Sequence, residues 1–333
     1  MDLEQRTLRL GLTAILCAAV FRLCSLDPGV GMQRLPGRPM EETKESIQQT
    51  GQPVRSAASY GSYFPDFVET PAPAFPELPW FPDASQVEVY YARNVKPSLD
   101  ALIQKPLQWS LAAEQPTVLI LHTHTTESYT QKGEGYRETS AYRTLDERYN
   151  MLSIGDLVAD LLRERGIRVI HDRNLHDYPS YNGSYSDSRK TAREYLEQYP
   201  GIRLILDLHR DASDGTTGQL RTLAASEQTP CAQLMVVIGT NHDAYEENLS
   251  LGLKLHAQLE RQSPGITRPL QLRSQRFNQD LLPGMLLIEV GAAGNTHQEA
   301  LEAARQLALA VIALGNGTRD AEDIPEEAVR NSL

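Results

Sequence analysis

The chain has 333 residues, of which 41% are hydrophobic and 23% charged, so it is long enough to bury one sizeable core with length left over. Its formal net charge is −11 and its lysines and arginines form no cluster, which argues against a nucleic-acid-binding protein. Cys17 and Cys24 lie near the amino terminus and Cys231 stands alone in the remainder, so the cysteines indicate no disulfide within a globular domain.

An apolar run occupies residues 10–21, with Arg6 and Arg9 before it and Arg22 after it. The run has the size of a signal-peptide core, and with Arg22 snorkelling toward the interface residues 8–26 are also long enough to cross a bilayer. No cleavage site of small residues follows promptly, which favours an uncleaved anchor over a signal peptide. We therefore expect residues 1–26 to be a membrane anchor or signal segment, with the rest of the chain outside the membrane.

Residues 27–115 are rich in Pro, Gly, Gln, Ser and Thr. Proline removes backbone donors and disfavours helix in the preceding residue, so this stretch is predicted to be an extended linker. A partner-binding Pro-rich segment is the rival interpretation. At the other end, residues 316–333 are predicted to be a solvated acidic tail.

Between these segments, apolar residues recur with alternating helical and strand periods. Helices are predicted over residues 150–165, 186–199, 243–261 and 296–314, and strands over residues 118–121, 167–170, 202–208, 233–238, 269–272 and 285–290. This alternation predicts an α/β domain over residues 116–315, a three-layer αβα fold with a mostly parallel sheet and helices on both faces.

Ligands of such sheets gather at the carboxyl ends of the strands, and the strand over residues 118–121 ends in polar side chains. His124 and Glu127 form an H-x-x-E pair, a spacing that lets an imidazole nitrogen and a carboxylate oxygen reach one ion. A hydrolytic zinc site uses such donors with a third ligand from elsewhere. His122, two residues before His124, is a candidate second-shell donor or alternative ligand.

Two later strands also end in residues with suitable chemistry. Strand alternation predicts that Asp207 and His209 point to the same face, which makes His209 the candidate third ligand unless it is a core histidine bonded to Asp207. Glu289 lies between Ile288 and Val290 in an apolar strand, where a carboxylate is costly to bury. It is the candidate general base, with a buried ion pair as the alternative. Arg210 and Asn295 are candidates for supporting roles.

Several motifs, taken in order, resemble the stage II sporulation protein P family over roughly residues 116–315. They are His122-Thr-His-Thr-Thr-Glu-Ser-Tyr129, His176-Asp-Tyr-Pro-Ser-Tyr-Asn-Gly-Ser-Tyr185, Asp207-Leu-His-Arg-Asp-Ala212, Asn278-Gln-Asp280 and Glu289-Val-Gly-Ala-Ala-Gly-Asn-Thr296. The resemblance implies a zinc-dependent N-acetylmuramoyl-L-alanine amidase of peptidoglycan, with endopeptidase activity also attributed to the family. It further implies action outside the membrane during engulfment in endospore formers, alongside the sporulation proteins D and M.

Carried over to this sequence, the resemblance implies that His124, Glu127 and His209 are the metal ligands and Glu289 the catalytic acid/base. A ligand from Asp146-Glu147 remains open, since related amidases take one from the start of a helix. Two other functions remain open as well: a zinc carboxypeptidase or deacylase, and a membrane-anchored scaffold that binds peptidoglycan without cleaving it.

Overall fold

The computed structural model describes residues 84–91, 95–107, 110–130, 142–215, 218–225 and 229–316. The chain divides into two units, residues 1–69 and 70–333, and every described residue belongs to the second. The predicted anchor, the acidic tail from residue 317 onward and most of the predicted linker therefore lie outside the described residues.

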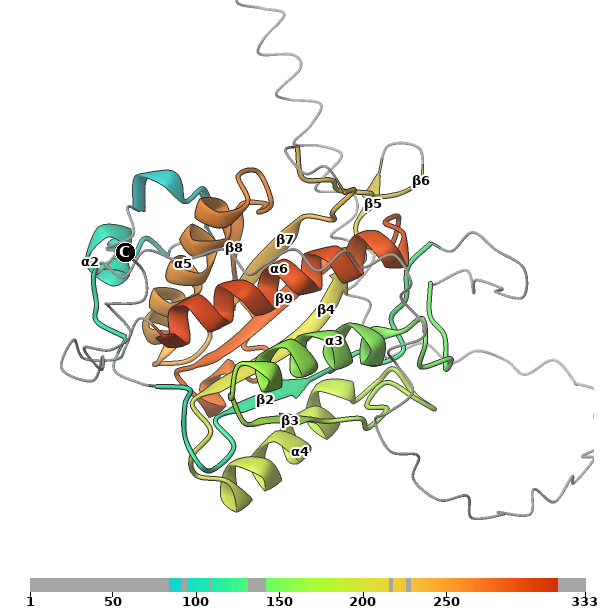
Figure 1. Cartoon of the computed structure of the whole chain (residues 1–333), viewed down its shortest axis with the longest axis horizontal. Coiled ribbons are helices and arrows are strands. Elements are labelled where there is room, and N and C mark those ends of the chain that lie inside the picture. Colours follow the sequence, from blue (N-terminus) through green and yellow to red (C-terminus); the bar gives the residue numbers. More distant parts are fainter. Residues whose placement is uncertain are drawn as a thin grey trace, which may run out of the picture. The chain divides into compact units, whose positions relative to one another are not determined.

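A seven-stranded sheet forms the centre of the second unit, in the order β1-β8-β7-β9-β4-β2-β3 (Figure 1). Its strands are β1 (Val89–Tyr90), β2 (Val118–Leu121), β3 (Val169–His171), β4 (Leu204–Asp211), β7 (Leu234–Gly239), β8 (Leu270–Arg273) and β9 (Met285–Ala292). All neighbouring pairs are parallel except β7 and β9, which are antiparallel. The predicted fold, a mostly parallel sheet within an αβα arrangement, is confirmed.

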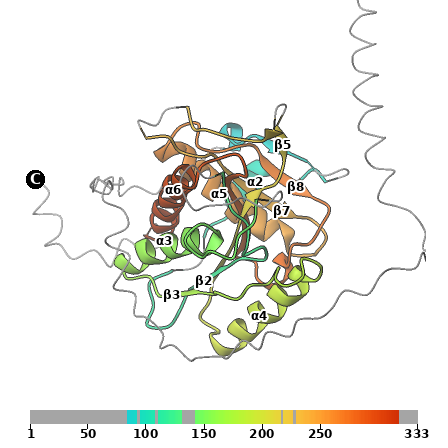
Figure 2. The same ribbon diagram turned by 90° about the vertical axis from the view of Figure 1, so that its right-hand side faces the viewer.

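The helices are α2 (Leu99–Ile103), α3 (Met151–Glu164), α4 (Ser184–Gln198), α5 (Tyr245–Gln262) and α6 (His297–Asn316). Helices α3 and α6 lie side by side over one face of the sheet, and α4 lies on the opposite face (Figures 1 and 2). A short hairpin, β5 (Asp214–Gly215) with β6 (Gly218–Gln219), follows β4. Two single turns of 3-10 helix, η3 (Ala84–Gln86) and η4 (Gln279–Leu281), complete the described elements.

Strand alternation determines which side chains meet which helix layer. Leu119 and Leu121 of β2, Ile205 of β4 and Met285 of β9 pack in one cluster with Ala192 of α4. The odd-numbered residues of these strands therefore face α4, and the even-numbered ones face the opposite layer. This assignment sets the direction of the β4 and β9 residues as far as His209 and Glu289, beyond which the pairing register shifts.

Part of the predicted linker contributes to the folded unit. Strand β1 pairs with β8, and Leu102 and Ile103 of α2 are buried. Ser250 and Lys254 of α5 donate side-chain hydrogen bonds to the backbone oxygen of Leu102. These elements have two and five residues, which is too short for a periodic pattern to mark them in a Pro-rich background.

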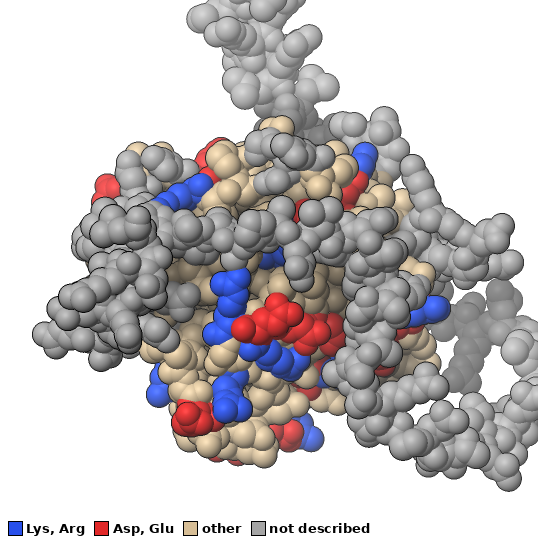
Figure 3. All heavy atoms as spheres, in the orientation of Figure 1, with Lys and Arg blue, Asp and Glu red and all other residues tan. Residues whose placement is uncertain are grey.

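Among the described residues, no helix has both the length and the apolar character needed to span a bilayer. On the face shown in Figure 3, the Lys and Arg side chains of described residues are interspersed with Asp and Glu side chains.

Candidate active site

The end of the sheet where β2, β4 and β9 finish brings distant polar residues together on the α4 face. His209 of β4 and Glu289 of β9 are direct register partners, two residues beyond the paired Asp207 and Leu287. Their odd numbers continue the series that packs under α4, so both side chains point to that face. The strand pairing alone therefore sets these two candidates side by side.

The turn after β2 brings His124 to the same place. The Thr123 backbone N–H and hydroxyl donate to the two carboxylate oxygens of Asp207, at 2.8 and 2.7 Å. These bonds fix the turn against β4, and the His124 ring lies 5.2 Å, centroid to centroid, from the ring of His209. His124 Nδ1 is 3.3 Å from the Ser184 hydroxyl of α4. Burial lowers the pKa of His124 to about 4, so its imidazole is neutral and able to bind a metal at physiological pH.

Glu127 completes the cluster with a carboxylate held by arginines. Its Oε2 atom lies 3.6 Å from His209 Nδ1 and accepts a 3.2 Å hydrogen bond from the backbone N–H of Arg210. Its Oε1 atom accepts from the guanidinium groups of Arg143 and Arg210. Burial alone would raise the pKa of Glu127, but Arg210 and His209 outweigh it and lower the pKa to about 2. Glu127 is therefore held ionised.

His209 lies between two carboxylates. Its Nε2 approaches Asp207 Oδ1 to 3.1 Å without the alignment of a hydrogen bond, and its Nδ1 faces Glu127. Burial alone would lower the pKa of His209, yet Asp207 and Glu127 raise it well above its usual value. The imidazole is consequently cationic, and binding a metal through it requires loss of a proton.

Glu289 differs from Glu127 and Asp207 because its negative charge is only weakly compensated. Its Oε2 atom is buried and has no hydrogen-bond partner. Burial raises the pKa of Glu289 to about 8, while the opposing effect of His209 is too small to prevent the shift. A carboxyl group with a pKa near neutrality, beside the imidazole of His209, has the properties of an acid/base catalyst.

The donors of this cluster can be compared with those that bind zinc in proteins. In the part of the chain that the structure describes, no three His, Cys, Asp or Glu side chains are grouped closely enough to hold a metal ion as they stand. The separation of Glu127 Oε2 and His209 Nδ1, 3.6 Å, is nevertheless close to the spacing of about 3.3 Å between two ligands of tetrahedral zinc. Asp207 beside the other nitrogen of His209 matches the carboxylate–histidine pairs that orient zinc ligands. The two imidazoles and one carboxylate thus fit the metal in kind and neighbourhood.

Two residues predicted to support the site lie elsewhere. His122 is even-numbered and faces the opposite layer, where its Nε2 is 2.9 Å from His171 Nε2 and its Nδ1 is 3.1 Å from the Leu208 carbonyl oxygen. Asn295 bonds to the backbone of Thr222 and to Glu299, organising the turn after β9. Neither therefore serves the cluster as a ligand or direct neighbour.

Arg210 lies at the cluster, whereas the Asp146-Glu147 pair lies apart from it. Arg210 does contact the cluster, since it holds Glu127 through both its backbone N–H and its guanidinium group. Asp146 pairs with Arg148 and Glu147 with Arg173 at the surface. The geometry therefore favours Glu127 over the Asp146-Glu147 pair as the carboxylate of the cluster.

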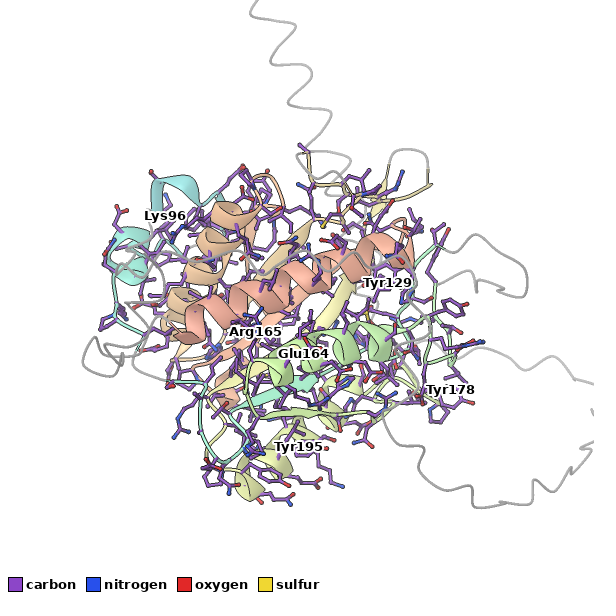
Figure 4. The ribbon with its side chains drawn as sticks, in the orientation of Figure 1. Lys96, Tyr129, Glu164, Arg165, Tyr178 and Tyr195 are labelled. Atoms are coloured by element: carbon purple, nitrogen blue, oxygen red, sulfur yellow. The ribbon has the colours of Figure 1, made fainter. Side chains whose placement is uncertain are left out.

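The structure brings several further side chains to the candidate ligands. Tyr181 stacks on His124 with centroids 4.6 Å apart, and its hydroxyl is 3.2 Å from His124 Nε2. Arg143 lies over the Tyr181 ring and forms an ion pair with buried Asp177. Tyr178, from the same loop, lies toward the same end of the domain as Tyr129 (Figure 4). The three tyrosines between residues 177 and 185 are the feature of the sequence that could have indicated this loop.

Comparison with known proteins gives one family match. The model of the family "Stage II sporulation protein P (SpoIIP)" matches residues 40–312. A similar curated protein is stage II sporulation protein P of Bacillus subtilis (strain 168), 27% identical over 216 residues, which cover 62% of this chain and 52% of the relative. This chain thus aligns with about half the length of that relative.

Similar solved structures include two N-acetylmuramoyl-L-alanine amidases. One, from Clostridium difficile 630, has a TM-score of 0.39 at 14% identity and covers 63% of this chain and 100% of that chain. The other, AmiC2 of Nostoc punctiforme, has a TM-score of 0.35 at 14% identity and covers 60% of this chain and 95% of that chain.

Proposed function

We propose that this chain, which belongs to the stage II sporulation protein P family, is a zinc-dependent N-acetylmuramoyl-L-alanine amidase that degrades peptidoglycan during sporulation. The observation that carries the proposal is the convergence of His124, Glu127 and His209 beside Glu289 on one face of the sheet. Two imidazoles, one ionised carboxylate and one acid of raised pKa are the groups that metal-assisted amide hydrolysis requires.

His124, Glu127 and His209 would hold the zinc ion. When bound, the ion supplies positive charge that acidifies a water molecule, polarises the amide carbonyl and lowers the pKa of nearby Glu289. Asp207 and Arg210 keep His209 and Glu127 in place.

Glu289 moves the proton in this mechanism. Its carboxylate accepts a proton from the attacking water as the new C–O bond forms at the amide carbon. It then delivers that proton to the departing nitrogen as the C–N bond breaks, so the carboxylate is regenerated and the products are an acid and an amine. Its position as the register partner of His209 places it next to the candidate metal ligands, where this proton transfer would occur.

The substrate assignment rests on family membership together with this chemistry. The bond cut would be the amide between the lactyl group of muramic acid and the first residue of the stem peptide. Cleavage of peptide cross-links is a second activity of the same site, because both reactions hydrolyse an amide. We further propose that residues 1–26 anchor the protein with its catalytic domain outside the membrane, where sporulation proteins D and M are candidate partners.

Replacing Glu289 by Gln tests the catalytic proposal. The variant should bind zinc but fail to release stem peptides from purified peptidoglycan, as followed by mass spectrometry of the soluble fragments. Glu194→Gln, an exposed change on α4, is the matched control and should leave cleavage intact. Turnover by the Glu289 variant, or wild-type turnover after complete removal of metal by a chelator, would contradict the mechanism.

The same fragments distinguish the rival functions. An amidase frees intact stem peptides from the glycan, whereas a carboxypeptidase releases only terminal amino acids. A peptidoglycan-binding scaffold would sediment with the cell wall and generate no new amino termini. Fractionation of cells into membrane and soluble parts, before and after removal of residues 1–26, tests the anchor.

A further inference from the structure

The amino-terminal turn of α4 faces the candidate active site. Ser184, its first residue, contacts His124 through its hydroxyl. The ring of Tyr185, its second residue, lies edge-on to His124 at a centroid distance of 5.5 Å and stacks nearly parallel on His209 at 6.5 Å. Tyr185 therefore covers the two candidate metal-binding imidazoles from the side of the sheet on which Glu289 lies.

Contacts behind Tyr185 fix its position. Its backbone oxygen accepts a 2.8 Å hydrogen bond from the Asn278 side chain, and its ring packs on Phe277 at 5.9 Å. Residues 277 and 278 belong to the loop that leads into β9, so both a helix and a neighbouring loop hold the side chain. A side chain set on a regular element and braced from behind keeps its functional atom in one place.

The hydroxyl of Tyr185, by contrast, has no partner. Tyr129 donates its hydroxyl hydrogen to the Val290 carbonyl, and Tyr195 donates to Asp172. Within the described part of the chain, the Tyr185 hydroxyl forms no hydrogen bond, although the ring is half-buried. The phenol is therefore an available donor on a ring that contacts both imidazoles.

A tyrosine phenol has an ordinary pKa of about 10, so this donor is protonated at physiological pH. It can donate a hydrogen bond but does not act as a base.

Resting on the amidase function proposed above, we propose that the Tyr185 hydroxyl is a catalytic residue that donates a hydrogen bond to the amide carbonyl oxygen as that oxygen gains negative charge. A neutral donor at the amino-terminal end of α4, beside the two candidate metal-binding imidazoles, is suited to stabilise the negative charge that develops on a bound carbonyl oxygen. No covalent bond to Tyr185 forms or breaks in this role.

Kinetics of Tyr185→Phe on a soluble muramoyl-peptide fragment tests the proposal, with the zinc-loaded protein. The phenylalanine keeps the ring contacts and removes only the hydroxyl. Loss of one oxyanion donor predicts a decrease in kcat of roughly 10²-fold with little change in KM. Tyr90→Phe, an exposed tyrosine on the edge strand β1, is the matched control and should retain wild-type kcat. An unchanged kcat, or a change confined to KM, would overturn the proposal.

A binding measurement separates failure of this proposal from failure of the amidase function. A non-cleavable phosphinate analogue of the fragment mimics the tetrahedral oxyanion, and its affinity can be compared with that of the ground-state fragment by calorimetry. Tyr185→Phe should weaken only the analogue, by roughly the same factor as kcat. Equal analogue affinities in the two proteins overturn the role of Tyr185 even if wild-type cleavage is normal. If the wild type neither cleaves the fragment nor binds the analogue, both proposals fall.

Discussion

The environment of Glu289 predicts that Glu289→Gln changes the pH dependence of stability in the metal-free protein. The usual pKa of the carboxyl is 4.5, and burial raises it to about 8 in the folded state. The folded protein therefore holds this proton more tightly than the unfolded chain does. The resulting stabilisation is complete below pH 4.5 and is lost as the pH rises toward about 8.

The magnitude follows from linkage. Between about pH 5 and about pH 7.5, a carboxyl group with these two pKa values loses about 3 kcal/mol of stabilisation. Glutamine does not titrate, so the free energy of unfolding of the variant relative to wild type should increase by that amount over this interval. Other groups titrate in both proteins and largely cancel in the difference.

Urea denaturation in the presence of a chelator, followed by circular dichroism at both pH values, measures this difference. Glu194→Gln, an exposed change on α4, should show no such increase. If Glu289→Gln and wild type have parallel pH profiles, the Glu289 carboxyl is not desolvated as described, and its assignment as the proton carrier loses its physical basis.

Three further predictions concern the surroundings of the site. Asp207→Asn should weaken zinc affinity by roughly 10- to 100-fold, because the Asp207 carboxylate contacts His209 and orients its imidazole. Competition with a chelating dye measures the affinity, and an unchanged value would show that Asp207 has no such role. Zinc affinity should rise with pH through neutrality and zinc binding should release a proton, because the pKa of His209 is raised. Calorimetry in buffers of different ionisation enthalpy measures the number of protons released. Release of no proton would show that His209 is already neutral in the metal-free protein. Gly155→Ala should lower the free energy of unfolding by about 1–3 kcal/mol, because an added methyl group would overlap the imidazoles of His122 and His171. The control Gly252→Ala should cost less, because its methyl group would meet only side-chain methyl groups, the nearest at 3.1 and 3.3 Å. Equal losses in the two variants, measured by chemical denaturation, would argue against the overlap at Gly155.

The sequence predicted most of the sheet because its strands are continuous apolar runs, and it located the candidate site because the polar residues follow those runs directly. Strand alternation was also sufficient to send Asp207 and His209 to one face. The same rule, applied to β2, directs His122 to the opposite layer, where it meets His171. Thus His122 could have been assigned to the other face from the sequence alone.

His124 could not be assigned in this way, because it lies in the turn three residues beyond the end of β2, whereas His122 immediately follows the strand. Its direction depends on the hydrogen bonds from Thr123 to Asp207, which join residues 84 positions apart. The contacts of Arg143 with Glu127 and of Tyr185 with His209 likewise depend on how separate segments meet. Local periodicity contains no information on such contacts, so the residues that complete the site were missed.

The three acids of the site, Glu127, Asp207 and Glu289, look equivalent in the sequence but differ in how their charges are compensated in the structure. Glu127 is matched by Arg210 and Arg143, and Asp207 by His209 and the Thr123 donors, so both remain ionised at neutral pH. An acid stabilised in this way is a fixed charge and exchanges protons poorly in the physiological range. Glu289 has no such partner on its buried oxygen, and its proton affinity therefore lies within reach of neutral pH. The distribution of partners, more than residue type or position on a strand, assigns proton transfer to Glu289 and leaves the other two acids to hold the site together.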